Sequence, residues 1–167
     1  MKPSLKPGLK HRFSYVVPES KTVPFTYPES PEIAAMPKVF ATGFMVVLME
    51  WTCIQLMAPH LDPGEGSLGI HVDISHSAAT PAGMTVTVDC ECTVVDGKKC
   101  VFHVKAHDGV DVIGEGRHER FVVAWDDFSQ TGGDTSDWAI RAQVFNADGS
   151  KSGAEFLVNT TTRGYQS

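Results

Sequence analysis

A hydrophobic stretch from Met36 to Pro59 constrains the fold of this chain more than any other feature. Residues 43–58, GFMVVLMEWTCIQLMA, are long enough for about four helical turns and carry apolar side chains in nearly every direction around the helix axis. Such a helix is expected to be buried on most sides, and it needs a sheet around it. A membrane span is not expected, because it takes roughly 20 uninterrupted apolar residues and this stretch contains Glu50.

Glu50 is the anomaly on the predicted helix, because its neighbours Leu48, Met49 and Trp51 are apolar. A buried carboxylate costs several kcal/mol unless it is paired, hydrogen-bonded or protonated. The simpler interpretation is that Glu50 reaches a wet edge or an ion pair. Its apolar neighbours favour a functional role.

Length and charge narrow the class of protein. The chain has 167 residues, which suggests one domain with an appendage, and its formal net charge is −6 without a long basic run, so nucleic acid is not an expected partner. The N-terminus, MKPSLKPGLKHRF, lacks the apolar region of a secretory signal, so a cytoplasmic location is expected. The cysteines lie in apolar patterns and are expected to be reduced, buried thiols.

Alternating apolar and polar residues predict five strands that form an antiparallel sheet. The strands are expected at 11–17, 67–76, 84–94, 100–107 and 112–125, with a hairpin turn at 96–99. Five prolines between residues 18 and 37 argue against regular structure there and suggest a loop or lid.

Two further polar residues are candidate site residues, one at the start of the predicted helix and one at the end of a predicted strand. Thr42 is a candidate helix N-cap, although the free N–H groups of the first turn suit a ligand oxygen equally well. His76 shares the parity of Ile70, Val72 and Ile74 and is therefore expected to face the helix. A histidine on an apolar face is more often a core residue, but a second inward ionisable group, Glu50, favours function.

A zinc site is not expected, because the alternation of side chains along the strands places its candidate ligands on opposite faces of the sheet. Cys90, Cys92 and Cys100 occupy positions where valine would serve, and His103 points the other way.

Basic residues on the last strand have two interpretations. Arg117, His118 and Arg120 are most simply a solvated face, and the functional alternative is that Arg120 or a neighbour meets a phosphate.

A long helix wrapped by an antiparallel sheet is the hot-dog arrangement, an α+β fold, and the motifs make the match specific. The run that begins at Tyr27 and includes YPESPE, VFATGFMVVLMEW, MAPHLDPGEGSLG, SHSAATP and AHDGVDVIGEGRHER closely resembles the fluoroacetyl-CoA thioesterase family. The resemblance covers roughly residues 10–127. It implies a homodimer that hydrolyses short acyl-CoA thioesters without a metal and with no cofactor beyond the coenzyme A of the substrate.

The resemblance also implies roles for individual residues. Thr42, Glu50 and His76 match the catalytic residues of the family, Gly69 matches a position that lines the acyl site, and Arg120 matches a basic residue near it. If Thr42 and Glu50 share a straight helix, their eight-residue separation places them about 12 Å apart along its axis. Either Thr42 acts through the substrate, or the chain bends near Gly43, or a dimer partner supplies one of the groups.

The segment before the helix departs from the family, because the fluoroacetyl-specific members carry phenylalanines where this chain has Ile33 and Met36. An aromatic gate selects small apolar acyl groups by packing and by excluding water. Hydrolysis of a broader range of short acyl groups is therefore expected here.

Residues 129–167 form a polar extension to the hot-dog domain, which is expected to end at residue 128. The extension is predicted either to form a hairpin, from residues 140–145 and 155–158, or to be partly disordered. The extension resembles one unit of a tandem β-repeat found in secreted bacterial surface proteins.

Two other functions fit an inward histidine and carboxylate in this fold. One is a hot-dog hydratase that acts on enoyl-CoA, and the other is an acyl-CoA-binding protein without catalysis, in which the two residues only satisfy each other.

Overall fold

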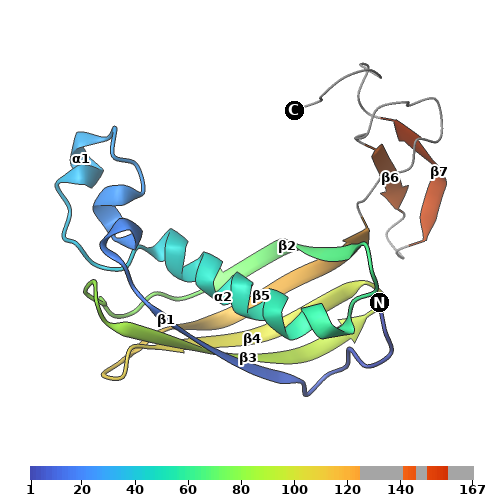
Figure 1. Cartoon of the computed structure of the whole chain (residues 1–167), viewed down its shortest axis with the longest axis horizontal. Coiled ribbons are helices and arrows are strands. Elements are labelled where there is room, and N and C mark those ends of the chain that lie inside the picture. Colours follow the sequence, from blue (N-terminus) through green and yellow to red (C-terminus); the bar gives the residue numbers. More distant parts are fainter. Residues whose placement is uncertain (125–140, 146–149, 158–167) are drawn as a thin grey trace.

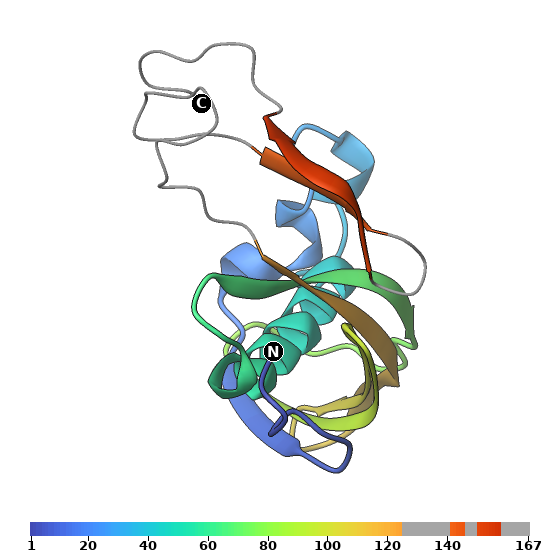
Figure 2. The same cartoon turned by 90° about the vertical axis from the view of Figure 1, so that its right-hand side faces the viewer.

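The computed structural model describes residues 1–124, 141–145 and 150–157, and its main body is a curved antiparallel sheet around one helix. The strands are β1 (Lys10–Val16), β2 (Glu65–Ile74), β3 (Thr85–Asp96), β4 (Lys99–His107) and β5 (Val112–Ala124), in the spatial order β1-β3-β4-β5-β2. Helix α2 (Thr42–Met57) crosses the concave face (Figure 1), and the view turned by 90° shows the sheet curving around it (Figure 2). The predicted α+β architecture and its five strands are confirmed.

Helix α2 is the core helix of this body, although only one of its sides is covered. Its sheet-facing residues are Met45, Leu48, Met49, Thr52, Cys53, Leu56 and Met57, all of which are buried. Residues 42–60 are long and apolar enough to cross a membrane by length and composition, but here the helix packs on the sheet. The expectation of burial on most sides was wrong, because Val47, Trp51 and Ile54 are 56%, 44% and 42% exposed.

The predicted alternation of buried and exposed side chains holds along β3 and β4 until a bulge interrupts it. Val86, Val88, Cys90 and Cys92 on β3 are buried, as are Cys100, Phe102, Val104 and Ala106 on β4. The pairing register then shifts between Cys92 and Val94, so Val94 is exposed and Val95 packs against the core instead. A bulge adds one residue to one strand and reverses the direction of the side chains that follow.

The four cysteines are free and buried, as expected. The Sγ atoms of Cys53 and Cys90 lie 3.4 Å apart, and this hydrogen bond together with burial raises the pKa of the Cys53 thiol. Burial raises the pKa of Cys92 and of Cys100 to about 11 each. His103 lies outside the core and pairs with Glu115 at 3.0 Å, so the parity that separates it from the cysteines is confirmed.

Strand β2 is an edge strand whose apolar residues are left uncovered. Ile70 lies at a register shift between Gly69 and His71 and is 53% exposed, and Val72 is 45% exposed. The prediction that both pack against the helix was wrong, since α2 packs mainly against β1 and β3, on the side of the sheet away from β2.

The proline-rich segment before α2 contains short helices, so the expectation of no regular structure was wrong. They are η1 (Glu19–Lys21), η2 (Val23–Phe25) and α1 (Pro31–Ala34), and a fourth short helix, η3 (Ala58–His60), follows α2. Proline suits the first turn of a helix, where its missing N–H would have no partner. In α1, Pro31 occupies that turn and the Ser30 hydroxyl accepts from the amide of Ile33 at 3.4 Å.

The turn between β4 and β5 is held by Asp108. Its Oδ1 accepts from the amides of Asp111 and Val110 at 2.9 and 3.0 Å, and its Oδ2 accepts from the Thr80 hydroxyl at 2.9 Å. Burial alone would raise the pKa of Asp108, but these hydrogen bonds outweigh it and leave the pKa below its usual value.

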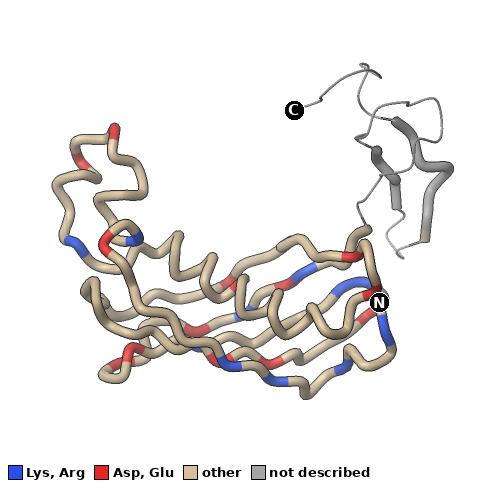
Figure 3. The backbone as a smooth tube through the Cα atoms, viewed as in Figure 1, with Lys and Arg blue, Asp and Glu red and all other residues tan. Residues whose placement is uncertain are grey.

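Charged residues of both signs are interspersed along the body (Figure 3). On the outer face of the sheet they form ion pairs, among them Arg12–Asp89 at 2.6 Å and Lys105–Glu115 at 3.3 Å. Exposed pairs of this kind each add little to stability.

Two strands are described in the C-terminal extension, and the second begins at Lys151, before the expected residue 155. Strands β6 (Arg141–Phe145) and β7 (Lys151–Leu157) pair antiparallel. The rest of the extension, and the boundary expected at residue 128, lie outside the described residues.

Candidate active site

The first half of the site is a pair of side chains at the N-terminal end of α2. Thr42 is the first residue of the helix, and its Oγ1 lies 2.8 Å from Nδ1 of His76, which follows the end of β2. The predicted capping role was wrong, because the N-cap residue is Ala41 and no side chain caps this end. The orientation of His76 toward the helix is confirmed.

The other ring nitrogen of His76 has no partner in the part of the chain that the structure describes. Its Nε2 is buried and unbonded, and it is the one buried side-chain nitrogen or oxygen of the described residues in this state. Such a group carries a desolvation cost of about 1–3 kcal/mol that a ligand or water relieves. His76 is therefore arranged to contact something beyond its own chain.

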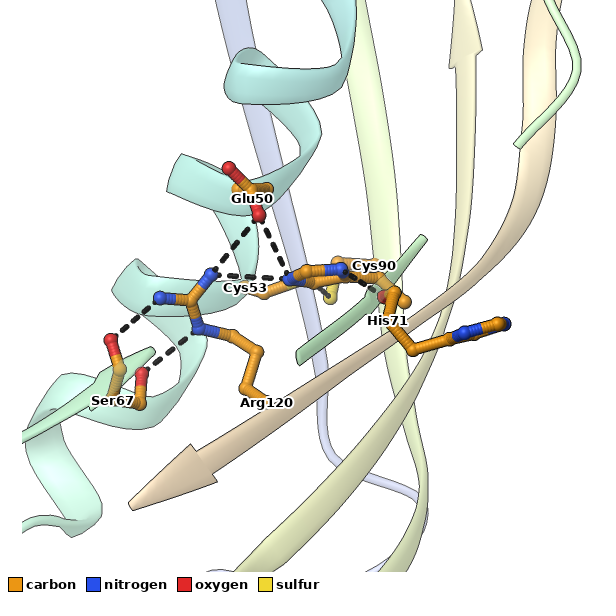
Figure 4. A network of polar contacts seen from close by, with 7 residues as sticks. Glu50, Cys53, Ser67, His71, Cys90 and Arg120 are labelled. Carbon is orange, nitrogen blue, oxygen red and sulfur yellow. Dashed lines mark hydrogen bonds and ion pairs between the residues drawn. The ribbon is translucent and has the colours of Figure 1, made fainter. Parts of the chain in front are cut away.

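The second half of the site surrounds Glu50 (Figure 4). The Glu50 side chain is 27% exposed, and its Oε1 lies 3.4 Å from Nε2 of His118 and 3.8 Å from Nη1 of Arg120. The carboxylate on the apolar helix is thus compensated by a buried cation. Both partners come from β5.

Arg120 is held by a set of hydrogen bonds that fixes its guanidinium. Its Nε donates to the Ser67 hydroxyl at 2.9 Å, its Nη2 donates to the Ser67 carbonyl at 2.7 Å, and its Nη1 donates to Nε2 of His118 at 3.1 Å. Burial lowers the pKa of Arg120 and the charge of Glu50 opposes this shift. Because an arginine stays protonated in proteins, the cluster keeps a positive charge facing Glu50.

The assignment of the basic residues of β5 to a solvated face was wrong for two of the three. His118 is 0% exposed and Arg120 is 4% exposed, whereas Arg117 points outward and pairs with Glu119. Parity was the available signal, since His118 and Arg120 share the parity of the buried Val122.

Gly69 belongs to the same cluster and is required there for steric reasons. It pairs with Arg120 across β2 and β5. A Cβ at this position would lie 2.5 Å from Oε1 of Glu50 and 3.0 Å from Cε1 of His118, which is closer than such atoms approach. Glu50, Gly69 and Arg120 therefore lie together in the structure.

The two halves of the site are separate within one chain. Helix α2 runs without interruption from Thr42 to Met57, so the bend near Gly43 is excluded. Eight helical positions keep Thr42 about 12 Å from Glu50 along the axis. Thr42 pairs with His76, and Glu50 pairs with His118 and Arg120.

The proposed lid residues, Ile33 and Met36, lie in the segment that precedes α2. Ile33 lies on α1 and is partly buried, and Met36 follows it and is 48% exposed. In Figure 1 this segment stands beyond the N-terminal end of α2, the end that carries Thr42.

Comparison with known proteins assigns the chain to a family. The model of the fluoroacetyl-CoA-specific thioesterase family matches residues 17–126. The fluoroacetyl-CoA thioesterase of Streptantibioticus cattleyicolor is 54% identical over 129 residues, which are 77% of this chain and 93% of the relative. The chain belongs to the fluoroacetyl-CoA thioesterase family.

Solved structures agree with this membership. One is a variant of a fluoroacetyl-CoA-specific thioesterase with a phenylalanine replaced by alanine, in complex with fluoroacetate and CoA. It is 55% identical and has a TM-score of 0.70, covering 72% of this chain and 96% of its own. A hot-dog-like protein from Thermanaerovibrio acidaminovorans, 23% identical with a TM-score of 0.61 over 74% of this chain and 84% of its own, supports the hot-dog fold alone. This chain is a hot-dog thioesterase.

Proposed function

We propose that this thioesterase hydrolyses short-chain acyl-CoA thioesters, fluoroacetyl-CoA among them, to the free acid and CoA. The observation that carries the proposal is the 54% identity over nearly all of a fluoroacetyl-CoA thioesterase, together with the Thr42–His76 pair and the Glu50–Arg120 pair. CoA is part of the substrate, and the proposed mechanism uses no other cofactor and no metal.

Glu50 is the proposed base or nucleophile of the reaction. Its ionised carboxylate either takes a proton from the attacking water or attacks the thioester carbonyl itself. Nη1 of Arg120 lies 3.8 Å from Oε1 and places a positive charge beside this carboxylate. Solvent labelled with ¹⁸O separates the two routes, since only a covalent route places the label in Glu50 during single turnover.

Thr42 and His76 are proposed to act on the leaving group of the thioester, the CoA sulfur. The Thr42 hydroxyl orients the imidazole through the 2.8 Å contact with Nδ1, so that Nε2, which is buried and unbonded, faces the substrate. His76 then delivers a proton to the CoA sulfur as the carbon–sulfur bond breaks. Amides at the N-terminus of α2 or at Gly69 are placed to stabilise the oxyanion.

The proposal includes a homodimer in which the two halves of a site come from different chains. Its support is the separation of Thr42 from Glu50 and the uncovered apolar surface beside Glu50. Strand β2 is an unpaired edge on which Leu68, Ile70 and Val72 are 55%, 53% and 45% exposed. Edge strands with apolar side chains favour pairing with another chain.

The proposed substrate range is broader than fluoroacetyl-CoA. Its support is the aliphatic lid, in which Ile33 and Met36 replace the aromatic residues that the family resemblance implies. Flexible aliphatic side chains adapt to acyl groups of different lengths more readily than rigid rings do.

A cytoplasmic location and a separate C-terminal extension complete the proposal. Four free, buried thiols suit a reducing compartment. The family match ends at residue 126, close to the expected domain boundary at 128.

Thiol release from acyl-CoAs with two to six carbons and from fluoroacetyl-CoA tests the proposed function. We expect turnover of the two- and three-carbon substrates and a loss of about 100-fold or more in kcat for Glu50→Gln. The absence of thiol release from every substrate, or an unchanged rate in Glu50→Gln, refutes the proposal. The enoyl absorbance of crotonyl-CoA is followed in parallel, because its decay without thiol release indicates a hydratase.

A further inference from the structure

His118 is a fully buried titratable residue to which the mechanism above gives no role. It lies on β5 and is 0% exposed. Its Nδ1 lies 2.9 Å from the backbone carbonyl oxygen of His71 on β2. Because a carbonyl oxygen only accepts hydrogen bonds, Nδ1 carries the hydrogen and the tautomer of the ring is fixed.

The opposite nitrogen of the ring is an acceptor. Nη1 of Arg120 lies 3.1 Å from Nε2, and a guanidinium has donors only, so Nε2 presents its lone pair. Burial has the largest effect and lowers the pKa of His118, Glu50 and the hydrogen bond to the His71 carbonyl raise it by less, and Arg120 and the His71 ring lower it slightly further. On β4, the uncharged Phe102 pairs with His118. The ring is therefore neutral near pH 7.

Glu50 faces this same lone pair. Its Oε1 lies 3.4 Å from Nε2, which is longer than the usual N–H···O separation of about 2.9 Å. An ionised carboxylate has acceptors only, so two acceptor atoms face each other when Glu50 is charged. Once a proton lies on Oε1, the Glu50 hydroxyl and Nη1 of Arg120 both point at this one lone pair, so Nε2 accepts from both in a shared, three-centre hydrogen bond.

We propose that His118 is a positioning residue that accepts a hydrogen bond from Glu50 after this carboxyl has taken a proton from the attacking water. The inference rests on the proposed function with Glu50 as general base. As the water oxygen bonds to the acyl carbon, its O–H bond breaks and the proton moves to Oε1 of Glu50. His76 then carries that proton to the CoA sulfur, the carbon–sulfur bond breaks, and Glu50 is ionised again.

Steric fit at Gly69 supports this pairing independently of charge. The space that a Cβ would occupy there lies 2.5 Å from Oε1 of Glu50 and 3.5 Å from Nε2 of His118. The missing side chain lets the carboxyl and the ring approach each other. Arg120 then keeps the ring from acting as a base, so the proton stays available to His76.

Two variants of His118 test the proposal in the full-length chain. Gln places an amide near the position of Nε2 and preserves an acceptor, whereas Phe preserves the ring shape without one. We expect kcat to fall about 100-fold in His118→Phe and less than about tenfold in His118→Gln, with KM within about threefold in both. A residue that only packs predicts the reverse order, and that order refutes the proposal.

Imidazole ¹⁵N chemical shifts give a second measurement that does not depend on activity. We expect a protonated Nδ1 and an unprotonated Nε2 for His118 at pH 7, assigned by comparison with His118→Gln. An imidazolium or the opposite tautomer overturns the proposal. Wild type without thiol release, or an unchanged rate in Glu50→Gln, indicates instead that the proposed function has failed.

Discussion

Gly69→Ala is the substitution whose effect follows most directly from the geometry of the site. The added Cβ would lie 2.5 Å from Oε1 of Glu50, about 0.9 Å short of ordinary contact at 3.4 Å. The atom that must yield is the end of a flexible side chain, so the carboxyl moves and the backbone does not. A misplacement of about 1 Å in a catalytic group costs roughly 100-fold in rate. We therefore expect kcat/KM to fall about 100-fold while the free energy of unfolding changes by less than about 1 kcal/mol.

Thiol release and urea unfolding, measured on the same preparation, check this prediction. Gly116→Ala is the matched contrast on the same pair of strands, because its Cβ would meet the backbone carbonyl oxygen of Asp73, which has little room to move. That variant is expected to lose about 1–3 kcal/mol of stability. If Gly69→Ala keeps its activity within threefold, or loses it only by unfolding, the placement of Glu50 against Gly69 is wrong.

Three further outcomes are expected. Asp108→Asn should lower the free energy of unfolding by about 1–2 kcal/mol at pH 7. Because the pKa of Asp108 is lowered in the folded state, this difference from wild type should shrink as the pH falls below about 4 in urea unfolding. Phenylalanine at both Ile33 and Met36 should reduce kcat/KM for butyryl-CoA relative to fluoroacetyl-CoA by about tenfold or more, and an unchanged ratio would remove the lid from the account of specificity. Deletion of residues 129–167 should leave kcat/KM within about twofold in the thiol assay, and a larger loss would assign the extension a role in catalysis.

The sequence predicted the regular elements well because their periodicity is a local property. Alternation located every strand of the five-stranded sheet, and the apolar run located α2 to within one residue at either end. Parity also placed Cys90 and Cys92 in the core and His103 outside it. Each of these inferences needs only the spacing of side chains along an element.

Parity failed where the chain changes its register. Bulges next to Gly69 and next to Cys92 each add a residue, so Ile70 and Val94 no longer follow the alternation. The exposure of Val72 has another cause, since α2 packs mainly against β1 and β3, on the side of the sheet away from β2. Neither a bulge nor the lateral position of a helix leaves a clear signal in one sequence.

The sequence named candidate site residues but did not give their contacts. The family resemblance brought out Thr42, Glu50 and His76, but the pairing of Thr42 with His76 depends on a tertiary contact across 34 residues. His118 was assigned to solvent because ionisable residues on an outer strand usually lie there. Its burial depends on Arg120 and on the His71 carbonyl, which only the folded structure brings to it.

The central claim is that one chain supplies Thr42 and His76 while a second supplies Glu50, and subunit exchange tests it most directly. His76→Ala and Glu50→Gln are each expected to be nearly inactive. After random exchange between the two, half of the dimers are mixed and one of their two sites is intact, so about a quarter of wild-type thiol release should return. No recovery, with exchange verified by native mass spectrometry, would place the whole site within one chain and contradict the account.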